Sequence, residues 1–343
     1  MTETIRWNVT NNKINNTELI EEAAQLLRAG STVAFPTETV YGLGADATNE
    51  AAVAKIFQAK GRPQDNPLIA HVATKKQLMQ LVEQIPGYVD KLLDQFTPGP
   101  ITFVLPSNGT CAENVTAGLS TVGVRIPDHP VAQQLLIMCD IPIAAPSANL
   151  SGKPSPTTAS HVWDDLNGKI AGLVDGGSTG VGVESTVVDC TQEIPIILRP
   201  GGVTKEQLEQ VVGHVMVDPA LVNEQEKPKA PGMKYTHYAP EVPLWVIAGS
   251  VDKLKNIMTR EISTGKRIGL LVSTNTAKQL EFEQTISLGN TLQEIAANLY
   301  DGLRKYKQSD VDLIICEAFP EVGIGQAVMN RLRKAATRYM DEQ

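Results

Sequence analysis

The chain has 343 residues, of which 42% are hydrophobic, 20% charged and 5% aromatic, and its formal net charge is −8 at pH 7. This length and composition are typical of a globular protein with two domains. The negative charge argues against a broad cationic surface for a long nucleic acid, but it is compatible with a local basic pocket.

No apolar run approaches the roughly 20 residues that cross a bilayer, and the N-terminus has no signal-peptide pattern. We therefore expect a cytoplasmic protein without membrane contact. Cys111, Cys139, Cys190 and Cys316 are widely spaced and form no CxxC pair. This usage favours buried, reduced thiols, and no set of His, Cys and carboxylate residues has the spacing of a zinc site. No metal ligands are predicted.

Helices and strands alternate irregularly over residues 1–213. Apolar residues at helical spacing predict a helix at 17–29, with Gly30 as its stop. Further helices are predicted at 49–59, 75–84, 130–139, 155–168 and 204–213, and strands at 31–35, 68–72, 101–105, 122–126, 141–145, 182–190 and 194–198. The irregular order indicates an α+β or mixed-sheet core.

The rest of the chain has two parts. Residues 214–241 contain five prolines and glycines that interrupt any regular pattern, together with Lys234, Tyr235, His237 and Tyr238, so they are predicted to be a linker with chemistry of its own. Residues 242–343 alternate regularly, with strands at 242–248, 267–273, near 286 and at 311–316, and helices at 250–264, 291–307 and 325–338. That alternation predicts a small parallel α/β sheet covered by helices.

Two cations follow the helix predicted at 49–59. Lys60 and Arg62 are separated only by Gly61. Pro63 and the Asn66-Pro67 pair stiffen the loop that follows. Cations at a helix C-terminus are common because they complement the helix dipole. A preorganised pair of cations also suits a small anion or a phosphate chain.

Further polar side chains stand in or after predicted strands. Arg125 lies within an apolar strand, where its charge needs either an internal salt bridge or a ligand carboxylate held by the guanidinium fork. Ser147 and Asn149 follow the strand at 141–145, a usual place for ligand contacts, although Asn149 could equally bond its own backbone in a turn. His71, at a strand end, is either a satisfied core histidine or a site residue.

Familiar catalytic signatures are missing. The sequence has no P-loop, and the loose dinucleotide fingerprint at 42–47 has no clean βαβ unit around it. No Ser/His/Asp spacing supports a triad, and no nucleophile is evident. The polar residues instead favour a site that holds anions and a hydroxyl-bearing ligand, with catalysis by positioning and charge neutralisation.

Taken together, these segments resemble the YrdC/YwlC family of threonylcarbamoyl-AMP synthases in its long, two-domain form. The matching segments are 35–44, 60–72, 97–105, 121–127, 145–154, 182–188 and 198–202, with the linker motif at 231–240. The resemblance implies a YrdC-like catalytic domain at 1–213 with a twisted mixed sheet around an open cleft. It also implies a linker at 214–241 that closes over the active site, and a Rossmann-like domain at 242–343.

The resemblance also implies a reaction and a set of residues. L-threonine, bicarbonate or CO2, and ATP with its Mg²⁺ would give threonylcarbamoyl-adenylate and pyrophosphate, for modification of the adenosine beside the anticodon in tRNAs that read ANN codons. Lys60 and Arg62 would be catalytic. Threonine would be bound by Thr39, His71, Arg125, Ala145 and Ser185, and ATP by Arg62, Asn66, Thr121, Ser147, Asn149, Ser155, Arg199 and Tyr238. A downstream threonylcarbamoyl transferase is a possible partner, and tRNA would be contacted at most indirectly.

Two other functions fit parts of the pattern. A non-catalytic RNA-binding module with a basic cleft is the main alternative, and the negative net charge and scarce aromatic residues count against it. Carbamoyl transfer, as in hydrogenase-maturation relatives, would require zinc-finger-like and acylphosphatase-like segments that the sequence lacks.

Overall fold

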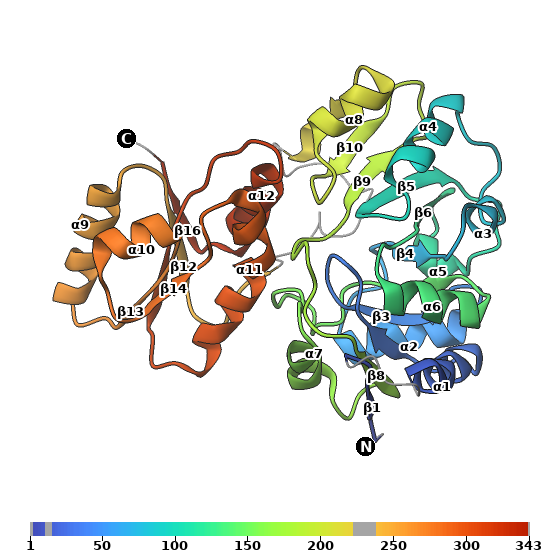
Figure 1. Cartoon of the computed structure of the whole chain (residues 1–343), viewed down its shortest axis with the longest axis horizontal. Coiled ribbons are helices and arrows are strands. Elements are labelled where there is room, and N and C mark those ends of the chain that lie inside the picture. Colours follow the sequence, from blue (N-terminus) through green and yellow to red (C-terminus); the bar gives the residue numbers. More distant parts are fainter. Residues whose placement is uncertain (1–2, 11–15, 222–237, 342–343) are drawn as a thin grey trace. The chain divides into compact units, whose positions relative to one another are not determined.

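The computed structural model describes residues 3–10, 16–221 and 238–341. The chain divides into two compact units, each described here by itself (Figure 1). The first comprises Met1–Ser151, Ser155–Gly180 and Glu184–Tyr235, and the second comprises Gly152–Pro154, Val181–Val183 and Thr236–Gln343. Most of the predicted linker, with Lys234, Tyr235 and His237, lies outside the described residues.

The first unit is built on a mixed sheet, to which the described residues contribute eleven strands. In spatial order these are β1 (Ile5–Asn8), β8 (Gly172–Asp175), β2 (Val33–Phe35), β3 (Gly42–Asp46), β7 (Ile143–Ala144), β4 (Ile69–His71), β6 (Thr121–Arg125), β5 (Ile101–Pro106), β9 (Thr186–Asp189), β10 (Ile196–Arg199) and β11 (Met216–Val217). Neighbours are parallel at β1–β8, β8–β2, β4–β6, β5–β9 and β10–β11, and antiparallel elsewhere. The mixed sheet predicted from the irregular alternation is confirmed.

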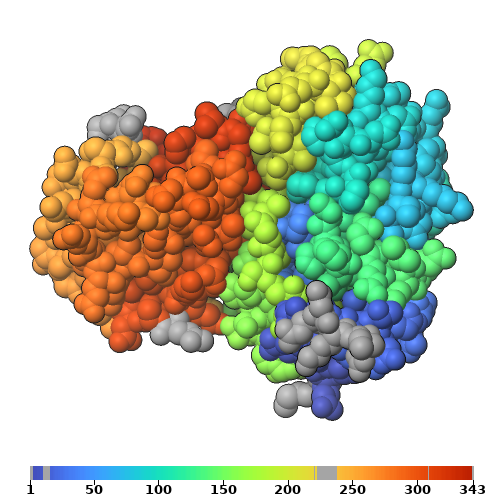
Figure 2. All heavy atoms as spheres, in the orientation of Figure 1, coloured from blue at the N-terminus to red at the C-terminus, as the bar shows by residue number. Residues whose placement is uncertain are grey.

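Helices pack on both faces of this sheet. On one face, α1 (Asn16–Arg28) and α6 (Pro130–Cys139) share a core with alternate residues of β2, Val33 and Phe35. The other face carries the larger core, which contains Ala34 of β2. It is covered by α2 (Glu50–Lys60), α3 (Lys75–Met79), α4 (Gly87–Phe96), α5 (Glu113–Thr116), α7 (Ala159–Leu166) and α8 (Lys205–Val212). Helices α4 and α8 pack against each other, and their surfaces meet where cyan and yellow adjoin in Figure 2.

The second unit is a parallel sheet with helices, as predicted. Its strands lie in the order β14 (Thr285–Ser287), β13 (Ile268–Val272), β15 (Leu313–Glu317), β12 (Leu244–Ile247) and β16 (Arg338–Met340), and all paired neighbours are parallel. Its helices are α9 (Val251–Ser263), α10 (Thr274–Leu280), α11 (Leu292–Lys305) and α12 (Gly325–Ala335), and 3₁₀ turns stand at Pro219–Leu221 in the first unit and Tyr306–Gln308 in the second.

Local capping chemistry accounts for several correct helix bounds. Thr204 and Gln207 form a reciprocal capping box that starts α8. Pro130 occupies the first turn of α6, where its missing N–H costs nothing. Gly61 ends α2 in the left-handed conformation with φ of 61°, which glycine adopts without strain. This stop sets where Lys60 and Arg62 leave the helix.

Some predicted elements are wrong. The helix predicted at 155–168 begins only at Ala159, because Thr158 is its N-cap and accepts from the amide of His161. The helix predicted at 75–84 ends at Met79. Strands β1, β3, β8, β11 and β16 and helices α4 and α5 had no prediction. The four cysteines are free and buried, as expected.

Candidate active site

A row of polar side chains crosses neighbouring strands of the first-unit sheet. His71 and Arg125 occupy paired positions on parallel strands β4 and β6. The register of β5 with β6 pairs Phe103 with Val124, so Thr102 lies opposite Arg125. The Thr102 and Ser185 hydroxyls are 2.8 Å apart. Side chains at paired positions share one face of a sheet, so these residues form a continuous polar strip.

Arg125 is the centre of this strip and is only 4% exposed. Its Nη1 donates to Thr39 Oγ1 at 2.9 Å, and its Nε donates to the carbonyl of Gly99 at 3.4 Å. Its Nη2 lies 2.6 Å from Oε1 of Glu38. Glu38 and Thr39 belong to the turn between β2 and β3, where the Thr37 hydroxyl donates to the carbonyl of Val40 at 2.7 Å. The turn thus presents a carboxylate and a hydroxyl to the guanidinium.

His71 is a buried, neutral imidazole. Its Nδ1 lies 3.1 Å from the carbonyl of Ile69, and its ring packs edge-on against Phe35 with centroids 6.3 Å apart. Burial, followed by the charge of Arg125, lowers the pKa of His71 from 6.5 to about 3. At neutral pH the ring therefore offers one N–H donor and one acceptor without adding charge beside Arg125.

Ser185 and Arg199 continue the strip. Arg199, the last residue of β10, donates through Nη2 to the carbonyl of Ser185 at 2.9 Å and lies 3.3 Å from its hydroxyl. The neighbouring Glu184 accepts from the Ser155 hydroxyl at 2.5 Å. All four side chains are buried. Two predicted ATP residues, Ser155 and Arg199, are therefore joined through the segment that carries a predicted threonine residue.

Lys60, Ser147 and Asn149 form a second cluster in the first unit. Lys60 is 3% exposed, and its Nζ donates to the carbonyls of Ser147 and Asn149, the latter at 2.6 Å. The Ser147 hydroxyl donates to Asn149 Oδ1 at 2.6 Å. Antiparallel bridging of Gly42 with Ser147 fixes the turn that carries these residues. The ammonium group of Lys60 is thus bound by the turn at Ser147 and Asn149, the two residues that the sequence predicted as ligand contacts.

A third group of predicted residues lies toward the N-terminal ends of β4 and β6, whereas His71 and Arg125 are at the C-terminal ends. This group consists of Arg62, Asn66 and Thr121. Arg62 Nη2 contacts the carbonyl of Asn66 at 3.4 Å. Asn66 is 1% exposed, and neither its amide nitrogen nor its amide oxygen has a hydrogen-bond partner. Thr121 begins β6, about 13 Å from Arg125 at the rise of a strand. A buried amide without hydrogen-bond partners lowers the stability of the folded state. A ligand that pairs with the Asn66 amide would recover this free energy.

The two remaining predicted residues have different environments. The amide of Ala145 donates to the carbonyl of Ile69 at 2.9 Å, which places Ala145 beside the β4 strand that ends at His71. Tyr238 belongs to the second unit, is 6% exposed, and stacks on Tyr300 with centroids 5.4 Å apart. An ATP contact by Tyr238 stays a prediction.

Sequence reasoning missed Glu38 and Thr102 as site residues. Glu38 lies between Thr37 and Thr39, and its only sequence signal is a carboxylate in a hydroxyl-rich turn after a buried strand. Its partner Arg125 is far away in sequence. Thr102 sits in an apolar strand, where a single threonine gives no signal.

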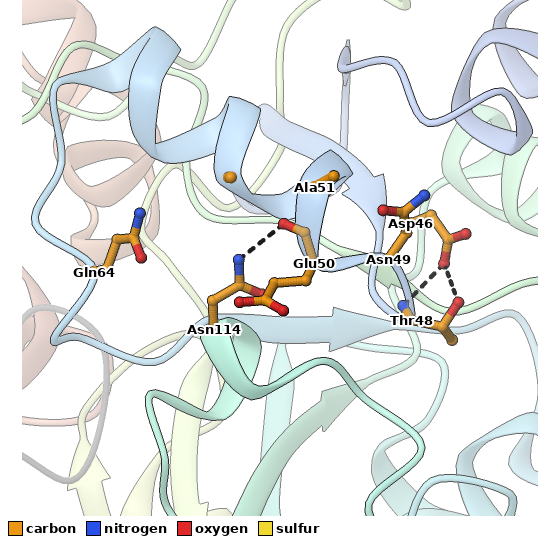
Figure 3. Close-up of a pocket in the computed structure, with 8 residues that line it drawn as sticks. Asp46, Thr48, Asn49, Glu50, Ala51, Gln64 and Asn114 are labelled. Atoms are coloured by element: carbon orange, nitrogen blue, oxygen red, sulfur yellow. Dashed lines mark hydrogen bonds between the residues drawn. The ribbon is translucent and has the colours of Figure 1, made fainter.

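A separate pocket in the first unit contains none of the predicted site residues. It is lined by Asp46, Thr48, Asn49, Glu50, Ala51, Ala54, Gln64 and Asn114. Figure 3 shows Asp46 accepting from Thr48 and Asn114 donating to the backbone carbonyl of Glu50. The amide oxygen of Asn114 is buried there without a hydrogen-bond partner, but no predicted site residue lines the pocket, so we assign it no role.

Comparison with known proteins identifies the family. A family model named Sua5_yciO_yrdC, described as "Telomere recombination", matches residues 25–201, and the model of the threonylcarbamoyl-AMP synthase C-terminal domain matches residues 203–337. The threonylcarbamoyl-AMP synthase of Bacillus subtilis is 51% identical over 339 residues, covering 97% of this chain and 98% of that protein. The chain belongs to the threonylcarbamoyl-AMP synthase family.

Members of this family from distant organisms share the whole architecture. The threonylcarbamoyl-AMP synthase of Pyrococcus abyssi is 48% identical, covering 94% of this chain and 97% of that protein. The crystal structure of P. abyssi Sua5 complexed with L-threonine matches with a TM-score of 0.94 and 45% identity, over 99% of this chain and all of that chain. The chain is thus a two-domain threonylcarbamoyl-AMP synthase family member, an enzyme of the nucleotidyltransferase type. Among the helices of the described residues, none has the length and hydropathy to cross a membrane.

Proposed function

We propose that the strip around Arg125 binds L-threonine. The observation that carries this proposal is a guanidinium only 4% exposed whose Nη2 contacts Glu38 Oε1 at 2.6 Å without forming a hydrogen bond to it. A planar guanidinium binds a carboxylate in a bidentate manner, so the threonine carboxylate belongs on Arg125. Thr39, neutral His71, Ala145 and Ser185 then surround the rest of the amino acid. The relative from P. abyssi was crystallised with L-threonine, which supports this choice of ligand.

ATP is proposed to lie toward Asn66 and Thr121. Alternate residues of a strand share a face, so Thr121, Gly123 and Arg125 project from β6 in the same direction. Gly123 has no side chain, so no side chain of β6 projects from this face between Thr121, in the proposed ATP subsite, and Arg125, in the proposed threonine subsite. The orphaned amide of Asn66 offers one donor and one acceptor, the pair that binds an adenine edge. The other proposed contacts to the nucleotide come from Lys60, Arg62, Ser147, Asn149, Ser155 and Arg199, and from Tyr238 of the linker.

The chemistry joins two anions. The unprotonated threonine amine adds to CO2 and releases a proton, or condenses with bicarbonate and releases water, to give an N-carboxylate. An oxygen of this N-carboxylate attacks the α-phosphate of ATP, and the bond to the leaving pyrophosphate breaks. Repulsion between the attacking and receiving anions is the main barrier, and fixed cations lower it. We propose that Lys60 and Arg62 do this. Their contacts with backbone carbonyls hold them in place before the substrates arrive.

Mg²⁺ is proposed to arrive with the triphosphate. Within the described ranges no group of three or more His, Cys, Asp or Glu residues could hold a metal ion. ATP-dependent sites commonly bind Mg²⁺ through substrate phosphates and water, so this donor set fits an ion carried by the nucleotide. When bound, the ion neutralises phosphate charge.

The product implies the cellular context. We propose that the adenylate serves a threonylcarbamoyl transferase that modifies the adenosine beside the anticodon in tRNAs reading ANN codons, in the cytoplasm. Direct tRNA binding is not required of this chain, and its net charge of −8 is poorly suited to it. The linker at 214–241 is proposed to close over the bound substrates.

The experiment that tests this function measures pyrophosphate release from ATP with each amino acid in turn, with and without bicarbonate. The proposal expects release that depends on both L-threonine and bicarbonate. Release that is indifferent to the amino acid would rule out the substrate assignment. Tight, salt-sensitive tRNA retention without ATP turnover would favour an RNA-binding module.

A further inference from the structure

Glu38 and Arg125 form a buried ion pair at the centre of the strip. Glu38 Oε1 lies 2.6 Å from Arg125 Nη2, and the two side chains are 13% and 5% exposed. The pair joins the β2–β3 turn to the end of β6. Removing two charges from water is expensive, and their attraction offsets this cost only when hydrogen bonds satisfy the remaining donors and acceptors.

That condition is not met here. Both carboxylate oxygens of Glu38 are buried without a hydrogen-bond donor, and Arg125 Nη2 is buried without an acceptor. The contact between them is therefore short but poorly aligned for a hydrogen bond. Buried polar atoms in folded proteins almost always have partners, so both members of this pair lack something that a ligand could supply.

The missing groups are complementary and specific. The arginine lacks an acceptor, and the glutamate lacks donors. A zwitterionic amino acid carries both on one carbon: a carboxylate that accepts and an ammonium with three N–H donors. We propose that Glu38 receives the α-amino group of the amino acid substrate while Arg125 receives its carboxylate. This inference rests on the proposed function of the site.

Binding then exchanges one ion pair for two. The Glu38–Arg125 pair, which has no net charge, opens. The zwitterion, which also has no net charge, inserts with its ammonium group on Glu38 and its carboxylate on Arg125, so the total charge of the buried region does not change. A site with Arg125 alone would attract any carboxylate. Glu38 adds repulsion against carboxylates that lack an ammonium group, which makes it a specificity determinant as well as a binding residue.

The competing interpretation is that Glu38 only holds Arg125 in place. The two interpretations differ for a ligand without the amine. The probe is 2,3-dihydroxybutanoate, which keeps the carboxylate and the β-hydroxyl of threonine and replaces the amino group with a hydroxyl. Calorimetric titration of L-threonine and of this analogue into wild-type protein and Glu38→Gln gives four dissociation constants.

The proposal expects wild-type protein to bind threonine at least about 10-fold more tightly than the analogue. Glu38→Gln should weaken threonine about 10- to 100-fold, the range for a hydrogen bond to a charged group, and should leave analogue affinity unchanged or improved. Equal weakening of both ligands, or no weakening of threonine, would overturn the assignment of Glu38 and leave the proposed function standing. Absence of threonine binding to wild-type protein would overturn both.

Two further variants complete the experiment, one as a control and one as a replacement for Glu38→Gln. Asp175→Asn neutralises the carboxylate of another Arg–carboxylate pair in the same unit, with Arg6 at 2.7 Å and Asp175 11% exposed, and should leave both affinities unchanged. If Glu38→Gln does not fold, Glu38→Asp withdraws the carboxylate by one methylene and keeps the charge. It should weaken threonine more than the analogue, and equal effects would again overturn the proposal.

Discussion

His71 and Arg125 stand side by side on parallel strands β4 and β6, and the imidazole is kept neutral beside the guanidinium. The arrangement gives the strip a single fixed cation at this point. It also links the stability of the first unit to pH, because a buried neutral histidine must gain a proton in acid.

The folded pKa of His71 is lowered to about 3 from 6.5. Between these values the unfolded chain binds more protons, so His71 lowers the stability of the folded state as pH falls below 6.5. The slope is at most about 1.4 kcal/mol per pH unit. His71→Asn should flatten the loss of unfolding free energy between pH 6.5 and 5 in urea titrations. His214→Asn removes an exposed imidazole and is the control. Parallel slopes for wild type and His71→Asn would contradict the assignment.

Lys60 should matter more to rate than any other lysine of α2. Lys60→Met removes a cation from the proposed phosphate region and should lower threonine-dependent pyrophosphate release about 10²- to 10³-fold. It also removes the donor to the buried carbonyl of Asn149 and the part-buried carbonyl of Ser147, so unfolding should cost about 1–3 kcal/mol less. Lys55→Met is the matched control, because Lys55 lies on the same helix and donates to the carbonyl of Gly30 at 2.7 Å. Similar rates for both variants would argue against a catalytic Lys60.

Asn66→Leu should separate stability from function. The variant removes a buried amide without partners, so the free protein should gain about 1 kcal/mol of stability. ATP affinity should fall about 10-fold or more, as the donor and acceptor for the nucleotide are lost. Asn298→Leu, which removes an amide that donates to Leu288, should bring no such gain. Differential scanning fluorimetry with and without ATP measures both effects, and unchanged ATP affinity would remove Asn66 from the site.

Gly201 should be intolerant of a side chain. A Cβ at this position would meet the carbonyl oxygen of Glu184 and the amide nitrogen of Thr186, each at 2.3 Å. Gly201→Ala must therefore displace the backbone that carries Ser185, which should destabilise the protein by about 1–3 kcal/mol and raise the KM for threonine. Gly87→Ala meets nothing within 4 Å and is the control. Equal KM values for the two variants would show that Ser185 is not a threonine contact.

Features fixed by local chemistry could be predicted from the sequence. Glycine at a helix stop, proline in a first turn and a capping box each act within a few residues, which is why the bounds of α2, α6 and α8 were close. Arg125 was recognisable because a charge within an apolar strand demands a partner. The partner itself was not, since Glu38 comes from a turn that only the fold brings to β6.

The missed elements follow the same logic. Strand β3 contains Gly42 and Gly44, which have low strand propensity. A Cβ at Gly44 would meet Ile143 Cγ2 at 2.8 Å and Phe35 Cε1 at 2.9 Å, so its glycine serves tertiary packing that no local pattern reveals. Ser155 resembled a helix start, but its hydroxyl donates to Glu184 instead.

The central claim is that a buried arginine and a buried lysine of one unit bring carboxylated threonine to ATP. The most direct measurement follows ¹³C-bicarbonate by mass spectrometry in reactions of wild type and of Arg125→Met. Wild type should yield a labile adenylate that contains threonine and one labelled carbon, and Arg125→Met should yield little at threonine concentrations that saturate wild type. Unlabelled adenylate from wild type, or equal labelled product from both proteins, would contradict the account.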